Sequence, residues 1–236
     1  MGYRVGNEDE HTTDAPKGER VVLLHGIFKT SRSMAPIAKV LGREGYKTLS
    51  VDYASTTASL DTIADTLRAT ILHDAFWEQS AAPVHFVTHS MGGLVIRRFL
   101  HKFKDSLPAG KIGRIVMIAP PNGGSEIADF VHQWPLYSRL YGPAGMELTT
   151  IAQRLPRDEV YYDLGIIAGT NKWLYLLSSL LIKGPNDGRV SVARTKYNGM
   201  KDHASVRGTH PFMMMRRDTK AQTIHFLKHG VFKHGQ

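Results

Sequence analysis

Short apolar runs alternate along the chain with longer segments in which apolar residues recur every three or four positions. Residues 21–24, Val-Val-Leu-Leu, form a continuous apolar run, which is typical of a strand buried on both faces of a sheet. The pattern predicts strands at residues 21–24, 46–53, 84–88, 114–119, 163–168 and 190–195. It predicts helices at residues 31–41, 59–77, 92–103 and 211–229.

This alternation of strands and helices predicts an α/β fold, with a mostly parallel sheet flanked by helices on both faces. Functional loops of such a sheet lie at the carboxyl ends of its strands. Residues 1–19 are polar and are predicted to be a loose tail, which leaves residues 20–236 as a single domain. The alternation stops after the strand at 114–119. The next residues, from about 121 to 160, are rich in Gly, Pro and aromatic side chains, which predicts an inserted helical cap or flap.

A chain of 236 residues with 42% apolar content is long enough for one domain with a substantial core. It has no cysteine, so disulfides and thiolate metal sites are excluded. No apolar run reaches the length of about 18 residues that a membrane-spanning helix needs. Residues 1–6 lead into polar residues and lack the apolar core of a signal peptide. We therefore expect a cytoplasmic protein, although the same residues are compatible with secretion from a longer precursor. The oligomeric state is not predicted.

The net charge is +9, from 30 Lys and Arg against 21 Asp and Glu. A basic surface can attract nucleic acid, anionic lipid or anionic substrates. Here the charges are scattered without a block of one sign, which is typical of a solvated surface. The aromatic residues also do not interleave with the basic ones, as a single-strand binding surface requires. We expect no nucleic-acid partner.

The strand predicted at residues 84–88 runs directly into the turn Thr88-His89-Ser90-Met91-Gly92-Gly93, and a helical pattern begins at once. A serine between a strand and a helix can lie on a turn so tight that the residues two before and two after it must be small. Gly92 meets this requirement, and Thr88, where the usual pattern has glycine, suits the end of a strand. We predict that Ser90 is a nucleophile. The alternative is that Ser90 only caps the helix.

Acyl transfer turns a carbonyl oxygen into an oxyanion, which two backbone N–H groups can stabilise. One donor is predicted to be the amide of Met91, directly after the nucleophile. The second is predicted on the loop after the first strand, where Gly26 lets the backbone turn and the amide of Ile27 points inward. The amide of Phe28 is the alternative. We interpret His25 as a structural hydrogen-bonding residue.

A serine hydroxyl needs a base, which in this kind of fold lies between the last strand and the final helix. His210 precedes Pro211, a residue favoured in the first turn of a helix, and we predict that His210 is this base. His203 is the alternative. The remaining histidines near the C-terminal end are predicted to be surface residues: His225, His229 and His234.

The acid of such a site fixes the tautomer of the base and stabilises its protonated form. Asp187 lies in the loop 184–190, and Gly188 after it allows a tight turn that aims the carboxylate at His210. The alternative is a plain Asn-Asp-Gly turn. Asp163 and Asp202 are weaker candidates, and Asp163 precedes a strand at the wrong end of the sheet.

Five segments carry a resemblance to a known family: residues 25–27 (His-Gly-Ile), 88–93 (Thr-His-Ser-Met-Gly-Gly), 119–125 (Ala-Pro-Pro-Asn-Gly-Gly-Ser), 186–190 (Asn-Asp-Gly-Arg-Val) and 210–213 (His-Pro-Phe-Met). From about Val21 to Leu227 the chain resembles small bacterial lipases and esterases of the α/β-hydrolase superfamily, and lipase-like domains of the GPI inositol-deacylase kind. The resemblance implies a triad of Ser90, Asp187 and His210, with the Ile27 and Met91 amides as the oxyanion hole. The chain departs from the family at Thr88. Its N-terminal region is also too short for the first two strands of the full fold, which predicts a compact variant.

We expect the insertion to roof the site and to line an acyl pocket with these residues: Phe28, Trp134, Leu136, Tyr137, Leu140, Tyr141 and Met146. The insertion residues among them could equally form the inner face of a cap helix. The predicted function is hydrolysis of short- to medium-chain carboxylic esters, free or in a lipid interface, without a metal or organic cofactor. The alternatives are another acyl bond (thioester, amide, lactone or lipid deacylation) and a non-catalytic lipid- or protein-binding domain.

Overall fold

The computed structural model describes residues 18–73, 82–108, 110–131, 142–149, 160–175 and 182–235. Of the predicted tail, only Gly18 and Glu19 belong to these residues. The predicted insertion is described at residues 121–131, at 142–149 and at 160.

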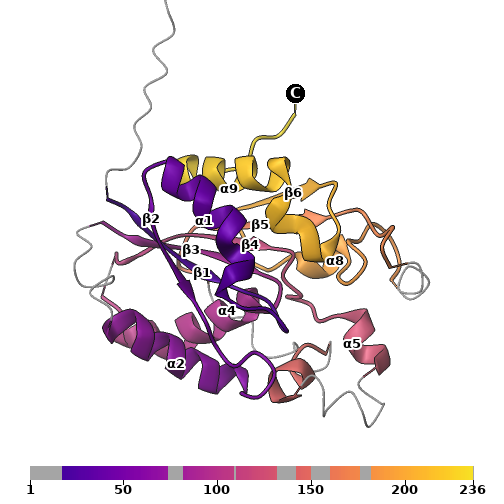
Figure 1. Cartoon of the computed structure of the whole chain (residues 1–236), viewed down its shortest axis with the longest axis horizontal. Helices are drawn as coiled ribbons and strands as arrows, with labels where there is room; N and C mark the ends of the chain where they lie inside the picture. The colour runs from indigo at the N-terminus through magenta and orange to yellow at the C-terminus, as the bar shows by residue number, and fades with distance from the viewer. Residues whose placement is uncertain are drawn as a thin grey trace, which may run out of the picture.

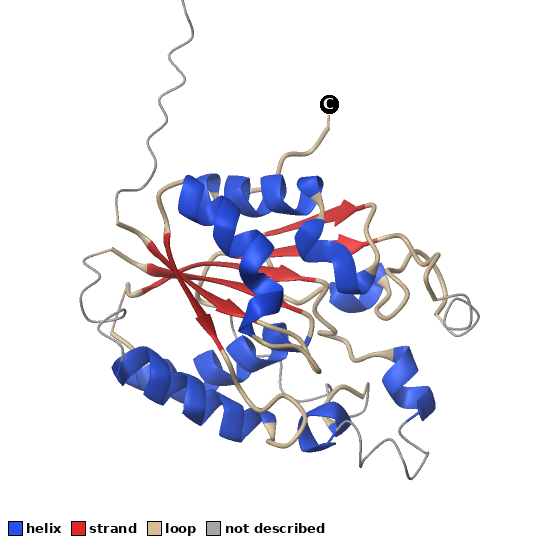
Figure 2. Ribbon diagram, viewed as in Figure 1, coloured by secondary structure: helices blue, strands red, loops and turns tan. Residues whose placement is uncertain are grey.

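In the described part of the chain, six strands form one sheet in the order β2-β1-β3-β4-β5-β6 (Figure 2). Their bounds are β1 Arg20–Leu24, β2 Lys47–Val51, β3 Val84–His89, β4 Ile112–Ile118, β5 Leu164–Gly169 and β6 Asp202–Val206. Every neighbouring pair is parallel. The predicted α/β fold with a parallel sheet is confirmed.

Helices cover both faces of this sheet, so the molecule has three layers (Figure 1). On one face lie α1 (Ala35–Arg43) and α9 (Arg217–His229). On the other lie α2 (Leu60–His73) and α4 (Met91–Phe103). None of the helices in the described ranges combines the length and the apolar character needed to cross a membrane.

The continuous apolar run of β1 serves two cores at once. Successive side chains of a strand point to opposite faces of the sheet. Val21 and Leu23 therefore pack with the α1 and α9 side, while Val22 and Leu24 pack with the α2 and α4 side. All five residues of the strand are buried, as the sequence pattern predicts for a strand covered on both faces.

The strand predicted at residues 190–195 is wrong, because the helix α8 (Val192–Thr195) begins there. The Ser191 side chain accepts a hydrogen bond from the Arg194 N–H and caps this short helix, which outweighs the strand preference of the Val-rich segment. The sixth strand is β6, which lies at the edge of the sheet and begins with two polar residues, Asp202 and His203.

The single helix predicted at residues 211–229 is also wrong in its first part. A 3₁₀ helix occupies His210–Met215, and α9 begins at Arg217. Arg216 between them is extended, with ψ 136°, and its N–H donates to the Met213 carbonyl. This extended residue lets the chain turn, so that α9 can pack along the face of the sheet.

The insertion begins with α5 (Glu126–Val131). A second helical stretch, at residues 142–146, lies next to the start of α2, where the Leu60 N–H donates to Glu147 Oε1 (2.9 Å). This hydrogen bond attaches the second described part of the insertion to the start of α2.

Replacing Phe226 with alanine tests the α9 side of the core. Phe226 is fully buried and packs against Phe232, with ring centroids 4.8 Å apart. Because the substitution leaves a cavity, we expect the free energy of unfolding to fall by about 3–5 kcal/mol. Urea denaturation measures it, with Val231→Ala as the control, since Val231 is 44% exposed. Equal losses in the two variants would contradict this packing.

Candidate active site

Ser90 occupies the turn between β3 and α4. Its backbone has φ 53° and ψ −123°, a conformation that side-chain-bearing residues rarely adopt. The Ser90 N–H donates to the Ile118 carbonyl of the neighbouring strand (2.9 Å), so the sheet holds the turn in place. This is the geometry of a nucleophile elbow.

Close backbone approaches explain the glycines around the turn. A Cβ at Gly92 would lie 2.7 Å from the Leu24 carbonyl oxygen and 2.8 Å from that of His25. A Cβ at Gly26 would lie 3.1 Å from the Cβ of Ser90. Thr88, in contrast, is a buried strand residue aligned with Leu24 and Met117, where a β-branched side chain is suited. The threonine at position 88, where the usual pattern has glycine, is therefore compatible with the turn.

His210 is the first residue of the 3₁₀ helix that follows β6. Its Nε2 lies 2.9 Å from the Ser90 Oγ. Its backbone is held from two sides, because its N–H donates to the Asp187 carbonyl (3.0 Å) and its carbonyl accepts from the Nε2 of His89 (3.1 Å). The ring and the main chain of His210 are therefore both fixed by neighbours.

Asp187 lies on the other side of the His210 ring. Its Oδ2 is 2.7 Å from His210 Nδ1, and its Oδ1 accepts the N–H groups of Arg189 (3.0 Å) and Val190 (2.9 Å). An ionised carboxylate only accepts, so Nδ1 of a neutral His210 carries the proton and Nε2 is left to accept from the Ser90 hydroxyl. The Asp187 and His210 side chains are only 1% and 5% exposed, which shields this chain of hydrogen bonds from water.

The structure thus brings together the three residues predicted from sequence, and it places the alternatives elsewhere. His203 lies in β6, with its Nε2 3.1 Å from the Thr195 Oγ1. Asp163 precedes β5 and pairs with Lys201 at 2.8 Å. Asp202 begins β6 and pairs with His234 at 2.9 Å.

The loop after β1 reaches the nucleophile turn. The Lys29 N–H donates to the Gly26 carbonyl (3.2 Å), and Phe28 inside this turn has φ 57°. Ile27 is buried, at 7% exposure, next to Gly26, which abuts Ser90. His25 is fully buried and stacks on Tyr53 with ring centroids 4.0 Å apart, and the Tyr53 hydroxyl donates to the His25 carbonyl. This agrees with a structural interpretation of His25.

Most of the predicted pocket falls outside the described residues: Trp134, Leu136, Tyr137, Leu140 and Tyr141. The other two are described, and Phe28 is 51% and Met146 36% exposed. The lining of an acyl pocket stays a prediction.

Two residues near the triad were missed in the sequence. His89 is part of the turn motif, and it holds the His210 carbonyl. Gly169 ends β5, where an added Cβ would lie 2.7 Å from the Cβ of Asp187. The position of Gly169 at the carboxyl end of a predicted strand is the signal that could have found it, because site loops gather at that edge.

Burial lowers the pKa of four histidines below the ordinary value of 6.5: His25, His89 and His203, and the more exposed His229. The pKa of His89 is held well below that value. Because its Nε2–H donates to His210, a neutral His89 leaves its Nδ1 unprotonated. That Nδ1 is buried and has no hydrogen-bond partner within the described ranges.

A parallel sheet with a strained serine after one strand, and an acid and a histidine on later strand-end loops, defines the α/β-hydrolase class of proteins. Solved structures with this fold are similar to the chain. The mature form of the lipase BlEst2 from Bacillus licheniformis has a TM-score of 0.73 at 18% identity, over 90% of this chain and 92% of that one. The metagenomic carboxyl esterase MGS0156 has a TM-score of 0.67 at 19% identity, over 83% and 65%. The phospholipase PlaB from Legionella pneumophila, solved with thio-NAD, has 0.61 at 18%, over 76% and 44%.

Within this class, the chain belongs to the family described as Domain of unknown function (DUF7379), whose model matches residues 3–169. A search of curated proteins finds no match. The similarity to the solved structures establishes the fold of the chain.

Gly169→Ala tests the close approach of β5 to the acid loop. The added methyl would also meet the Gly208 carbonyl oxygen at 2.7 Å, so backbone must move. We expect the free energy of unfolding to fall by about 1–3 kcal/mol in urea denaturation. Gly42→Ala is the control, because Gly42 lies inside α1 with nothing near its Cβ position and should stabilise by about 0.5–1 kcal/mol. A neutral Gly169→Ala would contradict the described contact.

The buried histidines predict how stability depends on pH. Their folded pKa values lie below the unfolded value of 6.5, so the unfolded chain binds more protons once the pH falls through 6.5. The stabilisation is complete above that pH and is lost progressively as the pH falls below it. Urea midpoints at pH 7.5, 6.5 and 5.5 should decrease in that order, and less steeply for His203→Gln. A flat series would refute the assignment.

Proposed function

We propose that this chain is a serine hydrolase that cleaves carboxylic acyl esters through Ser90, His210 and Asp187. One observation carries the proposal: the Ser90 Oγ, the two ring nitrogens of His210 and the Asp187 carboxylate form one hydrogen-bonded chain of 2.9 and 2.7 Å. Each group comes from a different strand-end loop, and the order of serine, histidine and carboxylate along the hydrogen bonds is the one that the chemistry needs.

The first half of the reaction forms an acyl-enzyme. His210 Nε2 takes the proton of the Ser90 hydroxyl as the Oγ attacks the ester carbonyl carbon. Asp187 stabilises the imidazolium that results, and its Oδ1 is held by two backbone amides so that Oδ2 stays aimed at Nδ1. The tetrahedral intermediate collapses, the carbon–oxygen bond to the alcohol breaks, and His210 returns the proton to the leaving alkoxide.

The second half reverses these roles with water. His210 deprotonates a water molecule, the hydroxide attacks the acyl carbon, and Ser90 leaves with the proton returned from His210. The products are a carboxylic acid and a free enzyme. The cycle uses no metal or organic cofactor.

The amides of Met91 and Ile27 are the proposed oxyanion hole. Met91 is the first residue of α4, so its N–H has no partner inside the helix. Neither this N–H nor that of Ile27 donates to a backbone carbonyl among the described residues. Ile27 follows Gly26, which abuts Ser90, and this supports its amide over that of Phe28 as the second donor.

The proposed substrates are short- to medium-chain acyl esters, free or at a lipid interface. Phe28 and Phe212 support this, because each lies within two residues of a site group and is exposed, at 51% and 45%. Apolar side chains next to the reacting carbonyl favour an alkyl chain over a charged group. The names of the solved neighbours, which include a lipase and a carboxyl esterase, agree with this class of substrate.

Ser90→Ala tests the proposal with p-nitrophenyl esters of increasing chain length. We expect turnover of the wild type to be highest for short or medium chains, and the variant to lose about 10⁴-fold or more in kcat. Ser205→Ala, an exposed serine of β6, is the control and should keep full activity. A fluorophosphonate probe should label the wild type and the control but not Ser90→Ala.

Each other outcome points to a different function. Turnover of acyl thioesters or amides with inert esters would keep the triad and change the bond. A wild-type chain that neither labels nor turns over any acyl substrate would refute the proposal and favour a non-catalytic binding domain.

A further inference from the structure

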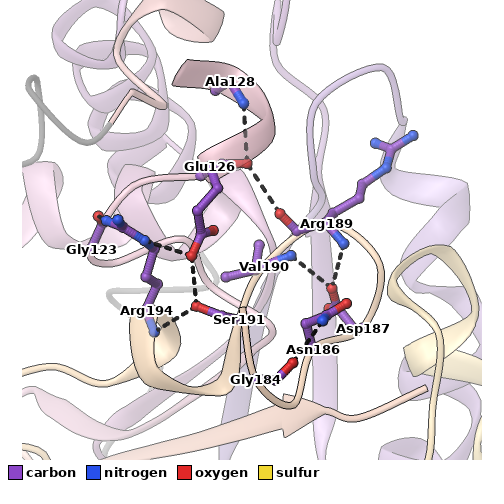
Figure 3. Close-up of polar contacts among 11 residues, drawn as sticks. Gly123, Glu126, Ala128, Gly184, Asn186, Asp187, Arg189, Val190, Ser191 and Arg194 are labelled. Carbon is purple, nitrogen blue, oxygen red and sulfur yellow. Dashed lines mark hydrogen bonds and ion pairs between the residues drawn. The ribbon is translucent and has the colours of Figure 1, made fainter. Parts of the chain in front are cut away.

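The start of the insertion is bonded to the loop that carries Asp187 (Figure 3). Residues 122–126 precede β5 in the sequence and residues 189–195 follow it, yet hydrogen bonds connect the two segments at both ends. At one end the Asn122 Nδ2 donates to the Thr195 carbonyl (2.8 Å), and at the other the Ser125 Oγ donates to the Arg189 carbonyl (3.1 Å).

Glu126 lies at the centre of this contact. Its Oε1 accepts both the Ser191 hydroxyl (2.9 Å) and the Arg194 Nε–H (2.7 Å). Arg194 in turn donates from Nη1 to the Gly123 carbonyl (2.7 Å), and its own carbonyl accepts the Gly123 N–H (2.8 Å). One carboxylate oxygen therefore holds Ser191, which directly follows the loop 184–190, and Arg194 of α8. Arg194 is in turn bonded to Gly123 at the start of the insertion.

The bonded residues lie directly beside the acid. The two amides that hold the Asp187 Oδ1 belong to Arg189 and Val190, and the Arg189 carbonyl is the group that Ser125 holds. Ser191 is the next residue along, and its backbone pairs with that of Asn186 on the other side of Asp187. A shift of Ser191 or Arg189 therefore moves the cradle in which the carboxylate lies.

We propose that Glu126 is a positioning residue that holds the Asp187 loop through Ser191 and Arg194. These contacts fix the position of the Asp187 carboxylate relative to the start of the insertion. The inference rests on the proposed function, since it assigns Glu126 a role in that reaction. Glu126 contacts neither Ser90 nor His210 through any described hydrogen bond, so it acts only through the acid loop.

Kinetics of Glu126→Ala and Glu126→Gln on a p-nitrophenyl ester test this role. A misplaced acid reduces the stabilisation of the transition state more than it reduces substrate binding. We therefore expect kcat of Glu126→Ala to fall about 10- to 100-fold, while KM changes less than about twofold. Glutamine keeps an oxygen at the Oε1 position for Ser191 and Arg194. It puts its NH₂ where Oε2, which is buried without a partner in the described ranges, now lies. Glu126→Gln should therefore recover most of kcat.

Glu44→Ala is the matched control. Glu44 pairs with Lys228 at 2.6 Å, and the two side chains are 35% and 23% exposed, close to the 20% and 35% of Glu126 and Arg194. Glu44 is the C-cap residue of α1, and no described bond links it to the acid loop. Its loss should leave kcat unchanged. Arg194→Lys provides a second test if Glu126→Ala folds poorly, because an ammonium cannot reproduce the guanidinium bonds to both Glu126 and Gly123, and kcat should again fall with KM kept.

A double-mutant cycle separates positioning from general loosening of the fold. If Glu126 acts through the acid, Glu126→Ala should have no further effect on fluorophosphonate labelling once Asp187→Asn has removed the carboxylate. The inference would be overturned if Glu126→Ala lowered the labelling rate by the same factor with and without Asp187→Asn. It would also be overturned if kcat were unchanged in Glu126→Ala and Arg194→Lys, or if Glu44→Ala lost as much kcat as Glu126→Ala. Each of these outcomes would still leave an active enzyme. An inactive, unlabelled wild type would instead overturn the proposed function, and this inference with it.

Discussion

The backbone of Ser90 is held at φ 53° and ψ −123° between β3 and α4, and the remainder of the site is arranged around that turn. Such a conformation costs about 1–3 kcal/mol and persists only where the surroundings determine it fully. Here β3 is buried along its whole length, the Ser90 N–H is bonded to β4, and α4 begins at once with Gly92 pressed against the carbonyls of β1. Three neighbouring strands therefore offset the strain of one residue. The serine side chain is presented at the carboxyl edge of the sheet without a loop that could move it.

His210 and Asp187 are positioned by main-chain contacts more than by side-chain packing. The His210 N–H donates to the Asp187 carbonyl and the His210 carbonyl accepts from His89, so its main chain is fixed independently of the contacts of its ring. The Asp187 carboxylate is held by amides of its own turn, and that turn is held by the insertion. Each group of the triad thus depends on backbone that a second segment fixes, which limits the freedom of the site even though it is assembled from loops.

Much of this arrangement could be predicted from sequence, for local reasons. Buried parallel strands are continuous apolar runs, so β1, β3, β4 and β5 are visible, and the order of serine, acid and histidine places the three groups on strand-end loops. The prediction failed where the local pattern misleads: Val190 and Val192 indicate a strand, but Ser191 caps a helix, and the polar residues of the edge strand β6 hide it. The Glu126 contacts join residues 65 and 68 positions apart, and no periodicity in either segment records them.

The two histidines at the centre of the site are both buried, but they face different neighbours. Their ring centroids are only 5.0 Å apart, and the proposed reaction requires one of them, His210, to become an imidazolium. A second positive charge at that distance would oppose this step. Burial keeps the pKa of His89 well below its ordinary value, and its donated hydrogen bond to the His210 carbonyl is satisfied in the neutral form. His210 is buried almost as deeply, but it faces the Asp187 carboxylate at 2.7 Å. The same buried environment thus holds the His89 ring neutral as a structural donor, while the ring that the proposed reaction protonates is the one that faces a carboxylate.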